Sequence, residues 1–154
     1  MKAITGIRGG SWLWVLVLAG FAGAAWAQGE GAGSGVRLRD LTAQNAVKLA
    51  AAEVKALASG ASVQTVSGQG NLRTWKNSKD RTLFASTPPG PGKTRGGQGK
   101  GTWHVADNGT YCVQIEWENV SENWCRFIYR MGDKYYGVKS GSDLAAPALE
   151  MKFF

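Results

Sequence analysis

From Ser62 to Lys139 the sequence is a succession of short β-branched and aromatic segments, separated by Gly, Asn, Asp and Pro. This spacing is typical of antiparallel sheets, because each segment has the length of a strand and each break has the composition of a turn. The strongest turn signals, Asp107-Asn108-Gly109 and Gly132-Asp133, predict that the last four segments form hairpins. The predicted strands are 61–67, 72–76, 81–86, 101–106, 110–118, 123–130 and 134–139.

One helix is predicted before these strands, from Thr42 as N-cap to Ala58, with Gly60 ending it. Apolar residues recur through it at helical steps, at Val47, Ala50, Val54 and Leu57. Such an apolar face needs a partner surface. The expected fold is therefore α+β and mainly β, with one N-terminal amphipathic helix packed on an antiparallel meander or a small, partly closed β-barrel.

The first 27 residues have the pattern of a secretory signal peptide. Lys2 and Arg8 precede an apolar stretch over 11–21, and Ala25-Trp26-Ala27 fits a signal-peptidase site. We predict cleavage near Ala27, a periplasmic or secreted location, and no stable transmembrane anchor after cleavage. An uncleaved anchor is the alternative, which the Gly and Ala content of the segment disfavours.

The rest of the chain is divided by composition. Residues 28–41 are predicted to be a flexible, Gly-rich lead, residues 42–139 a single domain, and residues 140–154 a C-terminal tail. Within the tail, Met151–Phe154 is interpreted either as a protein contact or as a final strand.

The chain is basic, with a net charge of +7, and part of this charge lies in a Pro- and Gly-rich loop over 87–100. Pro and Gly at this density predict no regular element there. Lys93 and Arg95 of this loop are candidate contacts for an anionic component of the cell envelope. A single Arg-Gly-Gly unit in an exported protein predicts no nucleic-acid partner.

Cys112 and Cys125 are the two cysteines of the chain and lie on neighbouring predicted strands. A hairpin that turns at Glu118-Asn119 places them directly opposite each other. In an exported protein this pattern predicts a cross-strand disulfide, worth about 2–3 kcal/mol in the chain-entropy model. A redox pair is the alternative, but its usual Cys-x-x-Cys spacing is not present here.

The same hairpin is apolar on both faces. Tyr111, Val113 and Ile115 alternate onto one face, whereas Phe127 and Tyr129 share the face of the cysteines. This predicts a sheet with one face against a helix and the other lining a barrel interior or groove, unless a bulge exchanges the faces. A groove for a small apolar or sugar-like ligand would use the candidate binding residues Trp103, Trp117, Trp124, Tyr135 and Tyr136.

Few residues suit catalysis. His104 is the single histidine and has no nucleophile pattern beside it, and Glu116 and Glu118 share a strand face next to a turn, where solvated charges are the simpler interpretation. One His and two Cys are too few for a Cys/His zinc site. We therefore expect no catalytic residue, metal or cofactor, with an enzyme using Glu116 or His104 as the alternative.

A set of short motifs between Thr42 and Val138 resembles the bacterial domain of unknown function family 995. The motifs are the helix and Gly60, then Gly101-Thr102-Trp103, Cys112, Trp117, Cys125-Arg126, Tyr129 and Gly132-Asp133-Lys134-Tyr135. The resemblance covers about two thirds of the chain and implies an exported protein with a helix leading into a small β-rich domain. The loop over 87–100 and the tail over 140–154 depart from the family pattern, and the family implies no activity.

These observations together predict an exported, non-enzymatic binding or envelope-accessory module. Its expected ligand is a small apolar or anionic envelope component. A protein that acts by contacting another exported protein is a further alternative.

Overall fold

The computed structural model describes residues 35–67, 70–92 and 95–154. The predicted signal peptide over 1–27, and the predicted lead up to residue 34, lie outside the described residues. The elements are α1 (Leu38–Ala43), β1 (Val47–Lys48), α2 (Ala51–Ala58), β2 (Ser62–Val66), β3 (Leu72–Asn77), β4 (Thr82–Ser86), β5 (Gln98–Val105), β6 (Tyr111–Trp117), β7 (Ser121–Met131), β8 (Lys134–Val138) and β9 (Ala148–Phe153).

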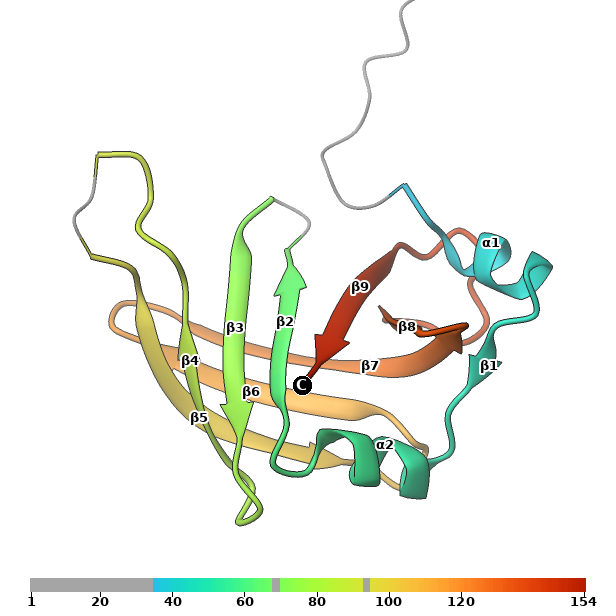
Figure 1. The fold of residues 1–154 in the computed structure, drawn as a ribbon, viewed down its shortest axis with the longest axis horizontal. Coiled ribbons are helices and arrows are strands. Elements are labelled where there is room, and N and C mark those ends of the chain that lie inside the picture. Colours follow the sequence, from blue (N-terminus) through green and yellow to red (C-terminus); the bar gives the residue numbers. More distant parts are fainter. Residues whose placement is uncertain (1–34, 68–69, 93–94) are drawn as a thin grey trace, which may run out of the picture.

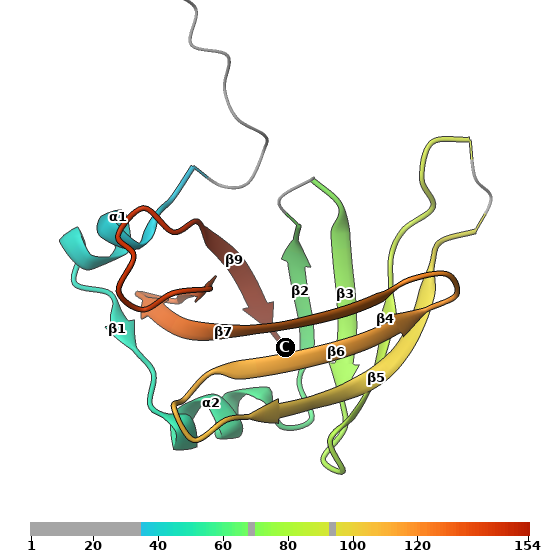
Figure 2. The same ribbon diagram turned by 180° about the vertical axis from the view of Figure 1, so that it is seen from behind.

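Strands β2 to β9 form a closed antiparallel barrel (Figure 1). Each strand pairs with its neighbours in sequence, and β9 pairs with β2 to complete the ring. The short β1 adds to the edge of β7 beyond the end of β6, and Figure 2 shows it from the other side. The prediction of a mainly β, antiparallel fold is confirmed, and the barrel is closed rather than partly closed.

The strand that closes the ring lies in the segment predicted as a tail, 140–154. Of the two interpretations of Met151–Phe154, the final strand is confirmed. Ala148 and Met151 are buried, and Val63 of β2 pairs with Phe153. The predicted domain boundary at residue 139 is therefore wrong, because β9 is the eighth strand of the barrel and closes it.

The prediction of one helix over 42–58 is also wrong, because two short helices occupy this region. Asn45 takes a left-handed φ of +56°, which ends α1, and the chain is extended at β1 before α2 begins. The first helix starts earlier than expected, so that Thr42 lies inside it and its hydroxyl donates to the Leu38 carbonyl at 2.9 Å. Leu38 and Leu41 are buried, so the predicted flexible lead ends before α1. Gly60 follows α2 with φ +76°, as its predicted role requires.

Strand β5 begins at Gln98, inside the loop predicted over 87–100. The prediction of an irregular loop up to residue 100 is wrong, because the glycines at this point, Gly99 and Gly101, are part of a strand. Both face the barrel interior, where a Cβ on Gly99 would lie 2.7 Å from Ile115 Cγ2 and one on Gly101 would lie 1.8 Å from the Gln114 carbonyl oxygen. Glycine therefore lets β5 and β6 approach closely at a bend of the wall.

The two apolar faces of the β6–β7 hairpin pack into two separate cores. Tyr111, Val113 and Ile115 belong to the core inside the barrel, together with Val54 and Ala58 of α2. The opposite face contributes Phe127 and Tyr129 to a second core outside the barrel. That outer core also contains Leu38 and Leu41 of α1, Ala146 from the segment before β9, and Ala148 at the start of β9. The two-faced prediction is confirmed, with no exchange of faces between Tyr111 and Glu116.

A buried hydrogen-bond chain joins the barrel interior to α2. The Trp75 indole donates to the Tyr111 hydroxyl at 2.8 Å, and this hydroxyl donates to the Asn77 side-chain oxygen at 3.0 Å. The Asn77 amide then donates to the carbonyl of Ala58, the last residue of α2, at 2.9 Å. Each polar group of this chain is thereby satisfied, and α2 is held at the end of the barrel where β3 ends.

We expect the burial of the Tyr111 hydroxyl to make the protein less stable at alkaline pH. Burial raises the pKa of Tyr111 to about 12. An unfolded tyrosine ionises at about pH 10. The contribution of Tyr111 to the free energy of unfolding is therefore fully present below pH 10, and about 2–3 kcal/mol is lost as the pH rises toward 12. Urea unfolding at pH 8, 10 and 11 measures this loss, and Tyr111→Phe should flatten it. An unchanged slope in that variant would contradict the assignment.

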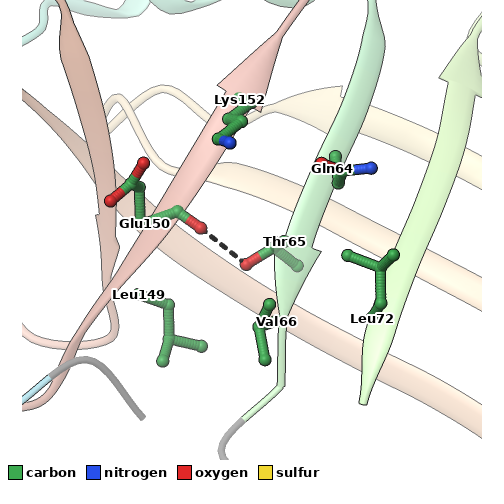
Figure 3. A pocket seen from close by; sticks show the side chains of 7 residues that line it. All are labelled: Gln64, Thr65, Val66, Leu72, Leu149, Glu150 and Lys152. Carbon is green, nitrogen blue, oxygen red and sulfur yellow. Dashed lines mark hydrogen bonds between the residues drawn. The ribbon is translucent and has the colours of Figure 1, made fainter. Parts of the chain in front are cut away.

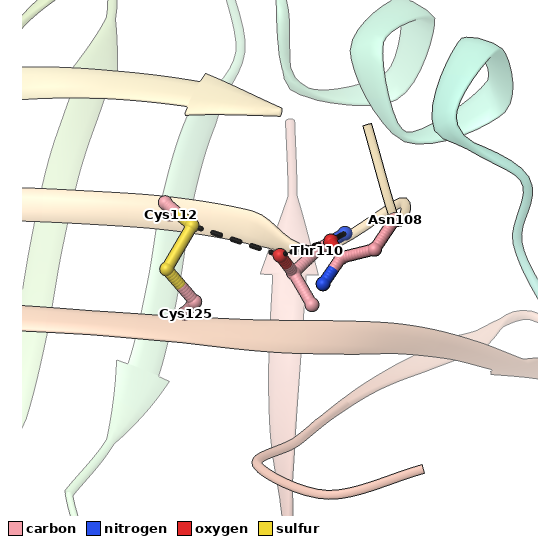
Figure 4. The surroundings of a disulfide bond; sticks show 4 residues. All are labelled: Asn108, Thr110, Cys112 and Cys125. Carbon is pink, nitrogen blue, oxygen red and sulfur yellow. Dashed lines mark hydrogen bonds between the residues drawn. A yellow bond between two sulfur atoms is a disulfide. The ribbon is translucent and has the colours of Figure 1, made fainter. Parts of the chain in front are cut away.

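The predicted disulfide between Cys112 and Cys125 is present (Figure 4). The two residues are direct partners in the β6–β7 ladder, as the turn at Glu118-Asn119 predicted. Cys112 is buried and Cys125 is exposed on the outer face. Nearby, the Thr110 hydroxyl donates to the Asn108 side chain at 2.7 Å, which fixes the preceding turn.

Candidate functional site

The barrel is closed at one end by α2 and open at the other. At the open end a cleft of about 700 Å³ lies between the β2–β3 loop, the β4–β5 loop and the β6–β7 turn. Asn71, Pro88, Arg95 and Glu118 line this cleft. Arg73 lines both the cleft and a smaller cavity of about 90 Å³ inside the barrel. We call this inner space the arginine cavity, after Arg73 and Arg126, which line it with Trp75, Glu122 and Trp124.

An ion pair crosses the arginine cavity from wall to wall. Arg73 of β3 donates through Nη1 to Glu122 of β7, and the Trp117 indole donates to the other oxygen of Glu122 at 2.9 Å. The carboxylate is therefore fully engaged by two donors. The Nε atom of Arg73 is buried and has no hydrogen-bond partner among the described residues.

The second arginine of the cavity has no acidic partner. Arg126 lies two residues from Trp124 on the inner face of β7, and its guanidinium carbon is 5.5 Å from the Trp124 ring centre. In the described part of the chain it forms no salt bridge. Partial burial lowers the pKa of Arg126. A cation in this position favours an anion in the adjoining space.

The strand next to β7 leaves room for the side chain of Arg126. Gly137 of β8 faces inward, and a Cβ there would lie 2.9 Å from Arg126 Cδ and 2.7 Å from Met151 Sδ. The apolar stem of Arg126 can therefore lie close to the β8 backbone while the guanidinium remains at the cavity. Two arginines and one glutamate give the cavity a net positive charge.

The seven candidate binding residues lie in different parts of the molecule. Trp124 lines the arginine cavity, and Trp117 donates a hydrogen bond to Glu122, which lines it too. Trp103 is buried toward the closed end, where its indole donates to the Ser78 carbonyl at 2.8 Å. Tyr135 packs against Phe153 at 5.5 Å between ring centres. The remaining candidates are Arg95, exposed at the open end, Lys93, which lies outside the described residues, and Tyr136 of the wider aromatic set, which is in the outer core.

The candidate catalytic residues do not form a site together. His104 and Glu116 are exposed on the outer face of the wall, and Glu118 is exposed in the β6–β7 turn. Among the described residues, no group of three His, Cys, Asp or Glu side chains could hold a metal ion.

Arg73, Glu122 and Arg126 were missed by the sequence analysis. The available signal was their alternation with apolar residues: Arg73 precedes Trp75 by two, and Glu122 and Arg126 flank Trp124 at the same step. A charge on an inward-facing strand position needs a partner inside the barrel. The ladder register places Thr65 opposite Arg73 and Ile115 opposite Glu122, which confirms the inward face.

A second hollow lies between β2 and β9, with lining residues from both faces of the barrel wall. This side groove has a volume of about 360 Å³ (Figure 3). Its lining residues are Gln64, Thr65, Val66, Leu72, Leu149, Glu150 and Lys152. Thr65 and Leu149 also line the arginine cavity, so the two spaces share a boundary.

The described helices are too short to span a membrane. A disulfide is typical of proteins that fold outside the reducing cytoplasm.

Comparison with known proteins gave one family. The chain matches the family described as Protein of unknown function (DUF995) over residues 15–127, a range that includes both cysteines and the residues of the arginine cavity on β3 and β7. No curated protein and no solved structure matches it. Because the match covers more than half of the 154 residues, the chain belongs to the DUF995 family of proteins of unknown function.

Proposed function

We propose that this chain is an exported, non-enzymatic binding module that takes a small anionic group of an envelope component into the open end of its barrel. The observation that carries the proposal is Arg126, a partly buried cation beside a cavity, without a carboxylate partner among the described residues. Arg73 lines both the cavity and the cleft, so we place the entry of the anion at the open end.

The energetics support an anion rather than a neutral ligand. A guanidinium that has lost part of its water without gaining a counter-ion is costly, and a carboxylate or phosphate oxygen restores a charge-assisted hydrogen bond. The buried Nε of Arg73 offers a second donor at the same cavity. Glu122 does not compete for the ligand, because Arg73 and Trp117 already engage it.

The surroundings of the cavity support binding over catalysis. The acid and base candidates, Glu116 and His104, are exposed on the outer wall, on the opposite face from the cavity. The positive charge of the chain supports an anionic partner in the cell envelope. The disulfide on the hairpin that carries Arg126 supports an exported protein.

Titration with carboxylates and inorganic phosphate, followed by calorimetry and tryptophan fluorescence, tests this function. We expect saturable binding, with a change in emission because Trp124 lies against Arg126. Arg126→Gln should weaken binding by about ten- to hundredfold, the effect of a hydrogen bond to a charged group. The matched control is Arg130→Gln, an exposed arginine four residues further along the same strand, which should bind as the unsubstituted protein does. Equal affinities in the two variants would overturn the proposal.

A further inference from the structure

We infer that the ligand is a single-chain amphiphile with a carboxylate head, held with the head in the arginine cavity and the hydrocarbon chain in the side groove. The inference rests on the proposed function and specifies the ligand of the same site. It is carried by the shared boundary of the two spaces, by their unequal volumes and by the apolar residues outside the wall.

The wall between the two spaces is thin at one place. The β2–β9 ladder runs from Val63 to Thr65 and ends there, where Thr65 pairs with Met151. At this point the Thr65 hydroxyl donates to the Glu150 carbonyl at 2.8 Å (Figure 3), so a side chain makes the last link between the strands. Thr65 and Leu149 have the arginine cavity on one side and the side groove on the other. We place the passage of the hydrocarbon chain at this point, where the backbone ladder between the two strands has ended.

The volumes of the two spaces indicate which part of the ligand each one holds. At about 90 Å³ the arginine cavity can hold a carboxylate, but not an extended hydrocarbon chain. The side groove is about 360 Å³, so most of the ligand must lie outside the barrel.

The floor of the side groove is apolar although it faces outward. Val66 and Leu72 are paired across the β2–β3 ladder and are 43% and 37% exposed. Leu149 of β9 borders the groove from the inner face of the wall, and Figure 3 shows the three side chains at the same end of the groove. Outward positions of a barrel wall are ordinarily polar, so adjacent exposed apolar residues indicate a surface that a ligand covers.

The charges exclude the reverse orientation. Lys152 lines the groove and is exposed, so its charge is already solvated and gains little from a carboxylate. A reversed ligand would also place its apolar chain beside Arg73, Glu122 and Arg126. Burying hydrocarbon against these groups would remove water from charges without replacing it.

A chain-length series tests the inference. Calorimetric titration compares acetate, hexanoate and decanoate with decanol and decyl phosphate, each below the concentration at which it aggregates. We expect the affinity of the carboxylates to rise by about two- to fourfold for each added methylene, with decanol at least tenfold weaker than decanoate. Decyl phosphate should bind no more tightly than decanoate, because the cavity is small.

Substitutions in the side groove test whether the hydrocarbon chain of the ligand binds there. Val66→Asp should lower decanoate affinity at least tenfold, and Val66→Ser should lower it to a smaller extent. Both variants should leave acetate affinity unchanged, because Val66 lines the side groove but neither the cleft nor the arginine cavity. Val120→Asp is the matched control, since Val120 is 61% exposed and lies outside the groove. Urea unfolding of each variant verifies that the barrel is intact.

The outcomes separate this inference from the function on which it rests. If short anions bind through Arg126 but chain length or Val66→Asp has no effect, the inference is overturned and the proposed function stands. Tighter binding of decyl phosphate overturns the carboxylate head. If decanol binds as tightly as decanoate, or if no anion binds, both the inference and the proposed function are overturned.

Discussion

A chain that stops at Pro147 is expected to lose cooperative unfolding and to remain largely unfolded. The truncation removes β9, which pairs with both β2 and β8 and is therefore the strand that makes the sheet a ring. It also removes Met151, buried in the inner core, and Ala148, buried in the outer one. Each neighbour would be left with an open edge and an exposed apolar face, which favours aggregation.

Circular dichroism during urea titration measures this loss, and binding of a hydrophobic dye reports the exposed interior. The matched control is Phe154→Ser, because the Phe154 side chain is 73% exposed and its backbone bonds to Ser62 do not depend on it. A truncated chain that unfolds at the same urea concentration as the full chain would show that β9 is dispensable.

Gly101→Ala is expected to destabilise the barrel by about 3 kcal/mol. The added methyl group would lie 1.8 Å from the carbonyl oxygen of Gln114 and 2.8 Å from its carbonyl carbon. These are backbone atoms of the paired strand, so no rotamer change can relieve the contact and β5 must separate from β6. The loss exceeds the small gain that alanine gives by restricting the unfolded chain.

Chemical unfolding of the purified variant measures the change. Gly141→Ala is the control, because the Cβ there would meet Phe127 at 3.4 Å, an ordinary contact distance. We expect its stability to be within about 0.5 kcal/mol of the original. Similar midpoints for the two variants would mean that the approach of β5 to β6 is not as close as described.

Local patterns were sufficient to predict the β6–β7 hairpin. A turn at Glu118-Asn119 determined the register, and from the register followed the Cys112–Cys125 pair and the two apolar faces. Everything needed for these predictions lies within one hairpin, where turn geometry fixes which residues are opposite.

Features that depend on distant strands were not predictable in this way. Arg73 and Glu122 are 49 residues apart and meet only because the sheet closes. The closure itself requires β2 to accept β9, and no local signal in β2 specifies that partner. The prediction of one continuous helix was wrong for a different reason. Apolar residues recur at helical spacing through 42–58, but Asn45 has a left-handed conformation that ends α1, and Leu49 lies in the inner core.

The position of the disulfide has a consequence for the cost of binding. Along Ser121–Arg126, β7 is paired with β6, whereas its pairing with β8 begins at Phe127. Within the described chain, the segment that carries Arg126 is thus held by a ladder on one edge, and the cross-link from Cys125 to Cys112 reinforces that edge from behind. A strand fixed in this way holds the backbone of Arg126 in place. If the proposed function holds, no backbone entropy of this segment needs to be lost on association, and more of the interaction energy of the head group can appear as affinity.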